Sequence, residues 1–200
     1  IKQIIENRPF ENAEDLLFKE GVTYSKLNKK ALDVLCRSGA LDEVVDDSFT
    51  GMKHFWMSCI QNRPKNKKKM QENIQEWFEE GEFSREEKIE NISNLTGIFP
   101  FDLVLSRDVR SAIQRYQVPA LGDWDPELQA AWFIPREKIA KKTKNGKPYW
   151  ILKVIDNTST VNTIRVWGVD PNRDLLHLNR PYGAKLQHSE DWGFSLRLNK

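Results

Sequence analysis

The chain has 200 residues, of which 39% are hydrophobic and 30% are charged. This balance is typical of folded globular proteins and excludes wholesale disorder, and the sequence holds no run of about eighteen apolar residues that would form a transmembrane helix. The net charge of +2 hides an asymmetry: residues 1–129 carry 18 Lys/Arg against 23 Asp/Glu (−5), and residues 130–200 carry 13 against 6 (+7). Because basic segments attract polyanions, affinity for nucleic acid should concentrate in the last third of the chain.

The cysteines and histidines indicate neither a disulfide framework nor a metal site. Cys36 and Cys59 are the only cysteines and form no CxxC motif, which predicts buried thiols in a reducing compartment, the cytoplasm. The three histidines are too scattered to form a metal-binding pattern, so we expect no metal and no cofactor. The chain begins with Ile1 and shows no signal peptide, which suggests an excerpt of a longer protein.

The first part of the chain is predicted to be helical. Asn12 is a favourable N-cap for a helix that Gly21 ends, and a second helix is expected over about 26–37, with Gly39 in a left-handed conformation behind it. A third short helix should begin at Leu41. Two helices joined by a glycine turn form a helix-hairpin-helix, whose turn can hold a phosphate on backbone amides without reading a base.

The predicted phosphate-binding residues of this region lie at the turn and beside it. The turn amides are those of Ser38, Gly39 and Ala40, and the basic side chains expected nearby are Arg8, Lys29 and Lys30. The later stretch 61–70 (QNRPKNKKKM) is also basic, and two interpretations stay open for it: a solvated loop or a second phosphate contact.

Three further helices are expected before the β-rich part of the chain. They cover about 70–78, 85–96 and 107–116, and Ser84 with Glu87 forms a capping box for the middle one. Residues 97–129 are rich in Pro, Gly and Asp and are predicted to connect two domains.

From residue 130 the hydrophobic pattern alternates, which indicates β-strands near 130–141, 148–156, 161–168, 182–188 and 192–198. Asn145-Gly146 is a strong hairpin signal between the first two. Five short strands in about seventy residues are typical of an OB-type barrel. We therefore predict a multidomain α+β chain: an all-α helix-hairpin-helix region (1–96), a connector (97–129) and a five-stranded OB-type β-barrel (130–200).

One face of the predicted barrel carries the candidate nucleic-acid site. Alternation places Tyr149, Lys153, Arg165 and Trp167 on a single face, where aromatic rings can stack on bases and cations can follow the backbone. An alternative is that Trp167 closes the end of the barrel. The candidate phosphate contacts are the lysines of the first hairpin, Lys141, Lys142, Lys144 and Lys147.

Four segments resemble the C-family replicative DNA polymerases, that is, the alpha subunit of bacterial DNA polymerase III. They are RPFENAEDLL, LNKKALDVLCRSGALDEV, FSREEKIENISNLTGIFPFDL and IAKKTKNGKPYWILKVIDNTSTVNTIRVWG, and they occur in the order found in the family. The resemblance implies tandem helix-hairpin-helix motifs that grip duplex DNA and contact the sliding clamp, followed by an OB domain near the single-stranded template.

The resemblance also implies what this chain lacks and where it departs from the family. Mg²⁺ would belong only to the polymerase core, which is absent here, so no catalytic residue is expected. Acidic residues follow SGALD where the family has a basic helix, and the nearest match to the clamp-binding peptide is imperfect, with Gln75, Trp77 and Phe78. Helix packing explains the two aromatic residues equally well. Such divergence would suit a phage-encoded member.

The leading hypothesis is a non-catalytic fragment of a DNA-directed DNA polymerase that binds primed duplex and single-stranded template in the cytoplasm. Two alternatives remain. One is a stand-alone repair or recombination factor that combines helix-hairpin-helix with OB. The other is a replisome protein-interaction module that binds the sliding clamp and has negligible affinity for DNA.

Overall fold

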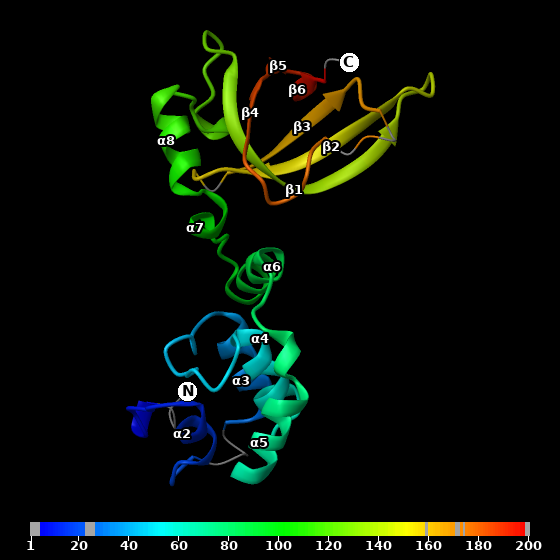
Figure 1. Cartoon of the computed structure of the whole chain (residues 1–200). Helices are drawn as coiled ribbons and strands as arrows, with labels where there is room; N and C mark the ends of the chain where they lie inside the picture. The colour runs from blue at the N-terminus through cyan, green and yellow to red at the C-terminus, as the bar shows by residue number, and fades with distance from the viewer. Residues whose placement is uncertain (1–4, 23–26, 159, 171–172, 174, 199–200) are drawn as a thin grey trace. The chain divides into compact units, whose positions relative to one another are not determined.

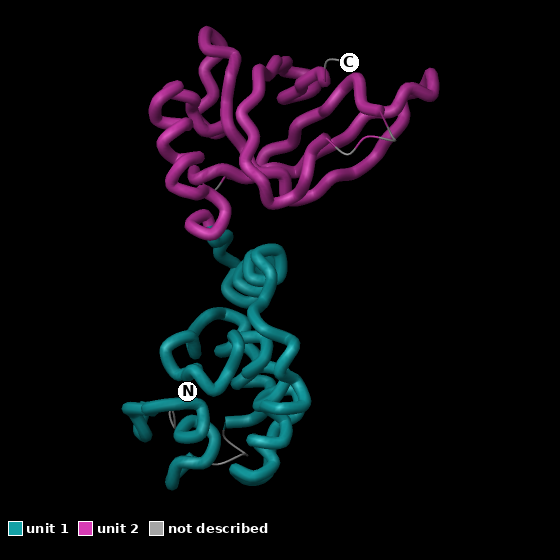
Figure 2. The backbone as a smooth tube through the Cα atoms, viewed as in Figure 1, with its two compact units in different colours: residues 1–100 teal, residues 101–200 magenta. Residues whose placement is uncertain are grey.

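The computed structural model describes residues 5–22, 27–158, 160–170, 173 and 175–198, and the chain divides into two compact units, residues 1–100 and 101–200 (Figures 1 and 2). The chain is α+β, with a six-stranded mixed sheet that curls through the second unit (Figure 1). Residues 101–129, which the sequence assigns to a connector, fall in the second unit, and Leu121 packs in its core.

Every named element among the described residues of the first unit is helical. The elements are α2 (Ala13–Phe18), α3 (Lys29–Arg37), α4 (Met52–Phe55), the π-helix η1 (Trp56–Gln61), α5 (Lys67–Glu76), the 3₁₀-helix η2 (Phe78–Glu80) and α6 (Arg85–Thr96). Side-chain caps set where four of them begin. The predicted Asn12 cap and the Ser84–Glu87 capping box are both confirmed, and Asn28 and Asn66 cap α3 and α5.

The predicted helix after Gly39 is wrong. Residues 40–44 form turns, in which the Val44 amide donates to the Leu41 carbonyl three residues back. The Asp46 carboxylate then accepts from the amides of Ser48 and Ala13, at 2.9 and 3.4 Å, which holds the following chain in a non-helical path against α2. The predicted helix-hairpin-helix pair therefore lacks its second helix at this position.

The core of the first unit contains both cysteines and one buried histidine. Cys36 and Cys59 are free thiols, packed with side chains such as Leu32, Phe55 and Ile60. His54 is fully buried; its Nδ1 accepts the Thr50 amide hydrogen at 3.0 Å, and its Nε2 lies 2.8 Å from the Ile74 carbonyl oxygen. Because Nδ1 is the acceptor, Nε2 carries the hydrogen and donates it.

Both thiols are expected to resist modification in the folded chain. Burial raises the pKa of both, that of Cys59 to about 12, so the reactive thiolate is scarce at ordinary pH. We expect Ellman's reagent at pH 8 to modify neither thiol of the native chain and to modify both in guanidinium chloride. Rapid reaction of one equivalent with the native chain would contradict this packing.

The second unit opens with α7 (Phe101–Val104), α8 (Arg107–Arg115) and the 3₁₀-helix η3 (Leu121–Asp123) and continues as sheet. The strands are β1 (Ala130–Lys142), β2 (Pro148–Ile155), β3 (Val161–Trp167), β4 (Tyr182–Lys185), β5 (Gln187–Ser189) and β6 (Gly193–Arg197). Their order is β4-β1-β2-β3-β6-β5, and every pair is antiparallel except β3 with β6.

The predicted strand over 182–188 is two strands that pair on opposite sides. Leu186 separates β4 from β5: its side chain is buried and its amide donates to the Gln129 carbonyl at 2.6 Å. The residues before it pair with β1 and those after it pair with β6. Because β4 and β5 are the two edges of the sheet and only one residue separates them, the curled sheet returns on itself at Leu186.

The β1–β2 hairpin and the sheet faces follow the predictions. The turn closes with a hydrogen bond from the Thr143 amide to the Lys147 carbonyl, and Gly146 has a φ of +76°, which few other residues adopt. On β2 and β3 the buried residues are Trp150, Leu152, Val154, Ile164 and Val166, which alternate with the predicted outer-face residues, so the predicted assignment of faces is confirmed.

Candidate nucleic-acid interface

A row of aromatic and basic side chains crosses the outer face of the sheet. The rings of Tyr149 and Trp167 stack with centroids 4.8 Å apart and planes 27° from parallel. Lys141 on β1 is the register partner of Tyr149, and Arg197 on β6 is the partner of Trp167. The row therefore runs Lys141, Tyr149, Trp167, Arg197 over four strands, with a cation at each end of an aromatic pair.

Trp192 adds a third ring beside this row. It lies in the turn between β5 and β6 with 65% of its surface exposed. The Arg165 guanidinium sits 5.4 Å from the centre of its ring and donates to its backbone carbonyl oxygen. Since Arg165 and Trp167 are two residues apart on β3, Trp192 lies on the same outer face as the aromatic row. An exposed tryptophan held by an arginine is suited to stacking on a nucleobase.

Some of the basic residues predicted for this face form an ion pair with an acidic side chain, and others do not. The four hairpin lysines, at 141, 142, 144 and 147, are exposed and make no ion pair with a described residue. Lys153, in contrast, pairs with the Glu137 carboxylate at 2.7 Å across the β1–β2 register. The positive potential of the face therefore comes chiefly from the hairpin, from Arg197 and from Arg165, whose partners on Trp192 are uncharged. The whole second unit has 16 Lys/Arg and 11 Asp/Glu, a net of +5.

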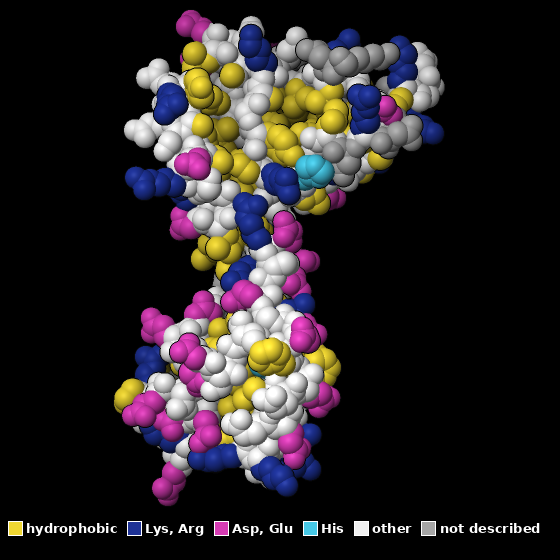
Figure 3. Space-filling model, in the orientation of Figure 1, with side chains coloured by type: hydrophobic (Ala, Val, Ile, Leu, Met, Phe, Trp, Pro, Cys, Tyr) yellow, Lys and Arg dark blue, Asp and Glu magenta, His cyan; other side chains and the backbone are white. Residues whose placement is uncertain are grey.

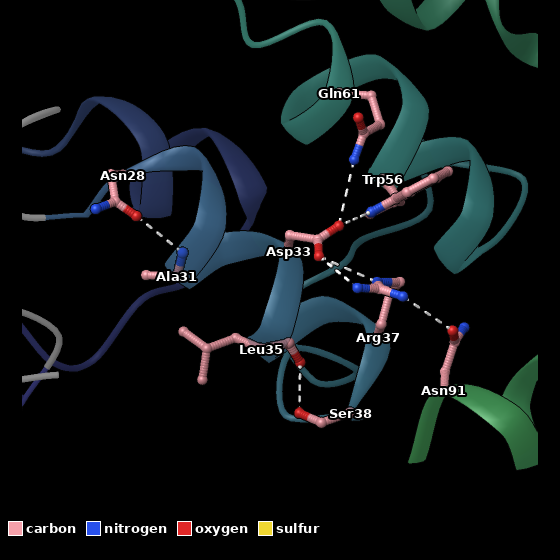
Figure 4. Close-up of polar contacts among 9 residues, drawn as sticks. All are labelled: Asn28, Ala31, Asp33, Leu35, Arg37, Ser38, Trp56, Gln61 and Asn91. Atoms are coloured by element: carbon pink, nitrogen blue, oxygen red, sulfur yellow. Dashed lines mark hydrogen bonds and ion pairs between the residues drawn. The ribbon is translucent and has the colours of Figure 1, made fainter. Parts of the chain in front are cut away.

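The predicted phosphate-binding amides of the first unit are already used. The Ser38, Gly39 and Ala40 amides donate to carbonyls of α3, those of Val34, Cys36 and Leu35 respectively. This is a Schellman C-cap, with Gly39 at a φ of +83°, and the Ser38 hydroxyl also donates to the Leu35 carbonyl (Figure 4). The amides of these three residues are therefore not available to hold a phosphate, which corrects that part of the prediction.

The basic residues predicted beside this turn lie elsewhere. Lys29 is the first residue of α3, and its Nζ donates to the Gln61 carbonyl at 3.0 Å, at the end of η1. Lys30 follows it and is exposed. Arg8 is exposed, and no contact among the described residues joins it to the two lysines. The lysines therefore belong to the start of α3, whereas the glycine turn lies at its end.

The clamp-binding candidates lie at the end of α5. Gln75 is exposed on α5, Trp77 is half-buried, and Phe78 starts η2 with 53% of its surface exposed. The rings of Phe78 and His54 meet edge to face with centroids 6.0 Å apart. The aromatic residues therefore also take part in packing, and clamp binding by this segment stays a prediction.

No protein-family model matches the chain, and no curated protein matches it either. In the part of the chain that the structure describes, no three His, Cys, Asp or Glu side chains group as a metal site would require. None of the helices found there has the length and apolar character needed to cross a membrane.

Proposed function

We propose that the chain binds single-stranded nucleic acid on the outer face of its sheet and is a non-catalytic DNA-binding region of a replicative DNA polymerase. The observation that carries this proposal is the row Lys141, Tyr149, Trp167, Arg197, with Trp192 and Arg165 beside it. Stacked, half-exposed rings offer faces to bases of any type, and the flanking cations attract the phosphates between them. The expected binding is strong at low salt and only weakly dependent on sequence.

The strand connectivity supports the finer assignment of an OB-type barrel. If β4 and β5 are counted as one strand broken at Leu186, the order of the five strands around the sheet is first, second, third, fifth, fourth, and the fourth pairs with both the first and the fifth. This order agrees with the Greek-key connectivity of an OB-fold, in which the second and third strands carry the ligand face. Tyr149 and Trp167 lie on those two strands.

The polymerase context rests on the four sequence segments that resemble the C family. Their order agrees with the order of the two units, a helical unit before a unit built on a sheet. In that context the second unit would hold single-stranded template, the first unit would contact primed duplex and the sliding clamp, and the protein would act in the cytoplasm. Mg²⁺ and the catalytic carboxylates would belong to a polymerase core outside this chain.

Removing two of the four lysine charges of the first hairpin tests the proposal. Fluorescence anisotropy with a labelled oligo(dT) probe over a salt series should give a binding constant that falls steeply as salt rises. Lys144→Ala/Lys147→Ala should reduce the slope of log K against log salt by about 1.4, since each phosphate contact to a single strand contributes about 0.7. Arg107→Ala/Arg115→Ala on α8 removes equal charge from the same unit and should leave the slope nearly unchanged.

The alternatives predict different outcomes. Absence of binding by the wild-type chain at low salt would overturn the proposal and favour a protein-interaction module that binds the sliding clamp. Equal effects of the two double variants would mean that net charge, not the hairpin, determines binding. A stand-alone repair factor would bind as proposed, and a polymerase core encoded in the same reading frame would exclude it.

A further inference from the structure

The segments that lead into two helices of the first unit, residues 27–29 and 61–63, lie against each other although they are far apart in the sequence. α3 begins at Lys29 behind the Asn28 cap, and α5 begins at Lys67 behind the Asn66 cap. Two hydrogen bonds tie the preceding segments together: Lys29 Nζ donates to the Gln61 carbonyl, and the Arg63 guanidinium donates to the Leu27 carbonyl. The first residues of the basic stretch 61–70 therefore lie against the start of α3.

This contact gathers basic side chains on a unit that is acidic as a whole. Residues 1–100 have 15 Lys/Arg and 18 Asp/Glu, a net of −3, yet 61–70 contains five Lys/Arg and no acidic residue. We use the name lysine cluster for the basic residues at the start of α3 and in the segment tied to it: Lys29, Lys30, Arg63, Lys65 and Lys68. Figure 3 shows Lys and Arg side chains, with some acidic ones, at the end of this unit where α5 begins in Figure 1.

Three lysines of the cluster make no ion pair within the described part of the chain, so no salt bridge explains why they are there. Lys67 pairs with Glu14, and Lys69 pairs with Glu72 at 3.3 Å. Lys30, Lys65 and Lys68, in contrast, are exposed and make no ion pair with any residue in the described ranges. Like charges on one surface repel one another, and an anion bound beside them lowers that repulsion.

The surroundings indicate a chain of phosphates and not a single bound anion. A surface hollow at the start of α5 is lined by polar and charged side chains, four of them basic (Arg63, Lys65, Lys68 and Lys69) and two acidic (Glu72 and Glu76). The Asn28 and Asn66 caps already accept the third amides of their helices, from Ala31 and Lys69. Contacts to a ligand must therefore come from long, exposed side chains spread over two helix starts, which suits phosphates spaced along a backbone.

We propose that the lysine cluster binds the sugar-phosphate backbone of duplex DNA. No aromatic side chain lines the hollow, so it offers nothing on which an unpaired base could stack, and a duplex presents its phosphates outward without needing such a platform. This inference rests on the proposed function, since it assigns the duplex to the first unit and the single strand to the second. It replaces the turn at Gly39 as the phosphate contact of the helical unit.

The test compares two labelled probes by fluorescence anisotropy: a blunt duplex of about 20 base pairs and oligo(dT). Lys30→Ala/Lys65→Ala/Lys68→Ala should weaken duplex binding about tenfold or more at low salt and lower its salt slope by about 2.7, since each phosphate contact to a duplex contributes about 0.9. Oligo(dT) binding should change less than about twofold if it depends on the other unit.

The matched control is Lys53→Ala/Arg85→Ala/Lys88→Ala, which removes equal charge from α4 and α6 and should leave duplex affinity within about twofold of wild type. Circular dichroism should be the same for all three chains. If the cluster variant binds duplex as wild type does, or if the control loses as much affinity, the inference is overturned. If wild type binds duplex through the cluster but fails to bind oligo(dT), the cluster stands and the single-strand proposal fails.

Discussion

Replacing both Trp167 and Trp192 with alanine is expected to weaken oligo(dT) binding at least about 30-fold. Stacking on one aromatic ring contributes about 1–3 kcal/mol per base, so two rings contribute at least about 2 kcal/mol. Trp192 is mostly exposed, and its loss should leave the fold unchanged. Trp167 also stacks on Tyr149, a contact worth about 0.5–1.5 kcal/mol of folding free energy, so the variant's thermal unfolding should be recorded beside its affinity.

The salt dependence separates stacking from charge in this experiment. Removing rings lowers affinity at every salt concentration without changing the number of phosphate contacts, so the slope of log K against log salt should stay that of wild type. Tyr116→Ala is the matched control, because Tyr116 is an exposed aromatic residue of the same unit, at the end of α8. If the tryptophan variant keeps wild-type affinity but unfolds at much lower temperature, then Trp167 has the structural role of closing the barrel end.

Local patterns predicted the elements that depend on neighbouring residues alone. The capping box at Ser84, the helix over 85–96 and the hairpin at Gly146 all follow from residues within a few positions of one another. Alternation placed Tyr149 and Trp167 on one face for the same reason, since the side-chain period of a strand is two. The stacking of their rings could be expected once the strands were known to be neighbours.

The features that were not predicted from the sequence depend on contacts between residues far apart in the chain. The break at Leu186 arises because the chain on its two sides pairs with β1 and β6. Trp192 was missed because only its contact with Arg165, 27 residues earlier, places it on the outer face. The sequence held one signal that could have identified Trp192. It is a tryptophan in the polar segment before Gly193, and a large aromatic residue is unusual in such a turn.

The lysine cluster and the turn at Gly39 illustrate the same limit in the first unit. The sequence gives the lysines of 61–70 and of α3 as separate groups, and the hydrogen bonds across residues 27–29 and 61–63 bring them together. The turn at Gly39 matched its expected conformation, but its amides bond to α3 and the next helix does not form. The left-handed glycine therefore indicated where a helix ends and not what the turn binds.

Asp33→Ala is expected to destabilise the first unit by about 3 kcal/mol. The carboxylate accepts from Trp56 Nε1 at 2.7 Å, from Gln61 Nε2 at 3.2 Å and from Arg37 at 2.6 Å, which joins α3 to η1 (Figure 4). Arg37 in turn donates to Asn91 on α6 at 3.2 Å. Hydrogen bonds to a charged group contribute about 1.5–3 kcal/mol each and are not additive when they share one acceptor, so about 3 kcal/mol is expected for the set.

Thiol exposure during urea denaturation isolates the unit in which this change acts, because both cysteines lie in the first unit. The midpoint at which Ellman's reagent gains access should fall for Asp33→Ala. Asp33→Asn keeps an acceptor for Trp56 but loses the charge opposite Arg37. Its midpoint should therefore lie between those of wild type and Asp33→Ala. The control is Asp47→Ala, which changes an exposed acidic residue. Its free energy of unfolding should stay within about 0.5 kcal/mol of wild type. A wild-type midpoint for Asp33→Ala would mean that the network contributes nothing measurable.

The pH dependence of the same midpoint tests the charge on Asp33. Burial raises the pKa of Asp33, but the bonds from Arg37 and Trp56 outweigh it and hold the pKa below the ordinary value of 3.8. Because the folded pKa is the lower one, the stabilisation is fully present above pH 3.8 and is lost as the pH falls through the folded value. The difference between wild type and Asp33→Ala should therefore be constant near neutral pH and should narrow below about pH 4. If the difference in midpoint between wild type and Asp33→Ala grew on acidification, the folded chain would favour the protonated carboxyl. Burial, and not the pairing with Arg37, would then control the pKa of Asp33.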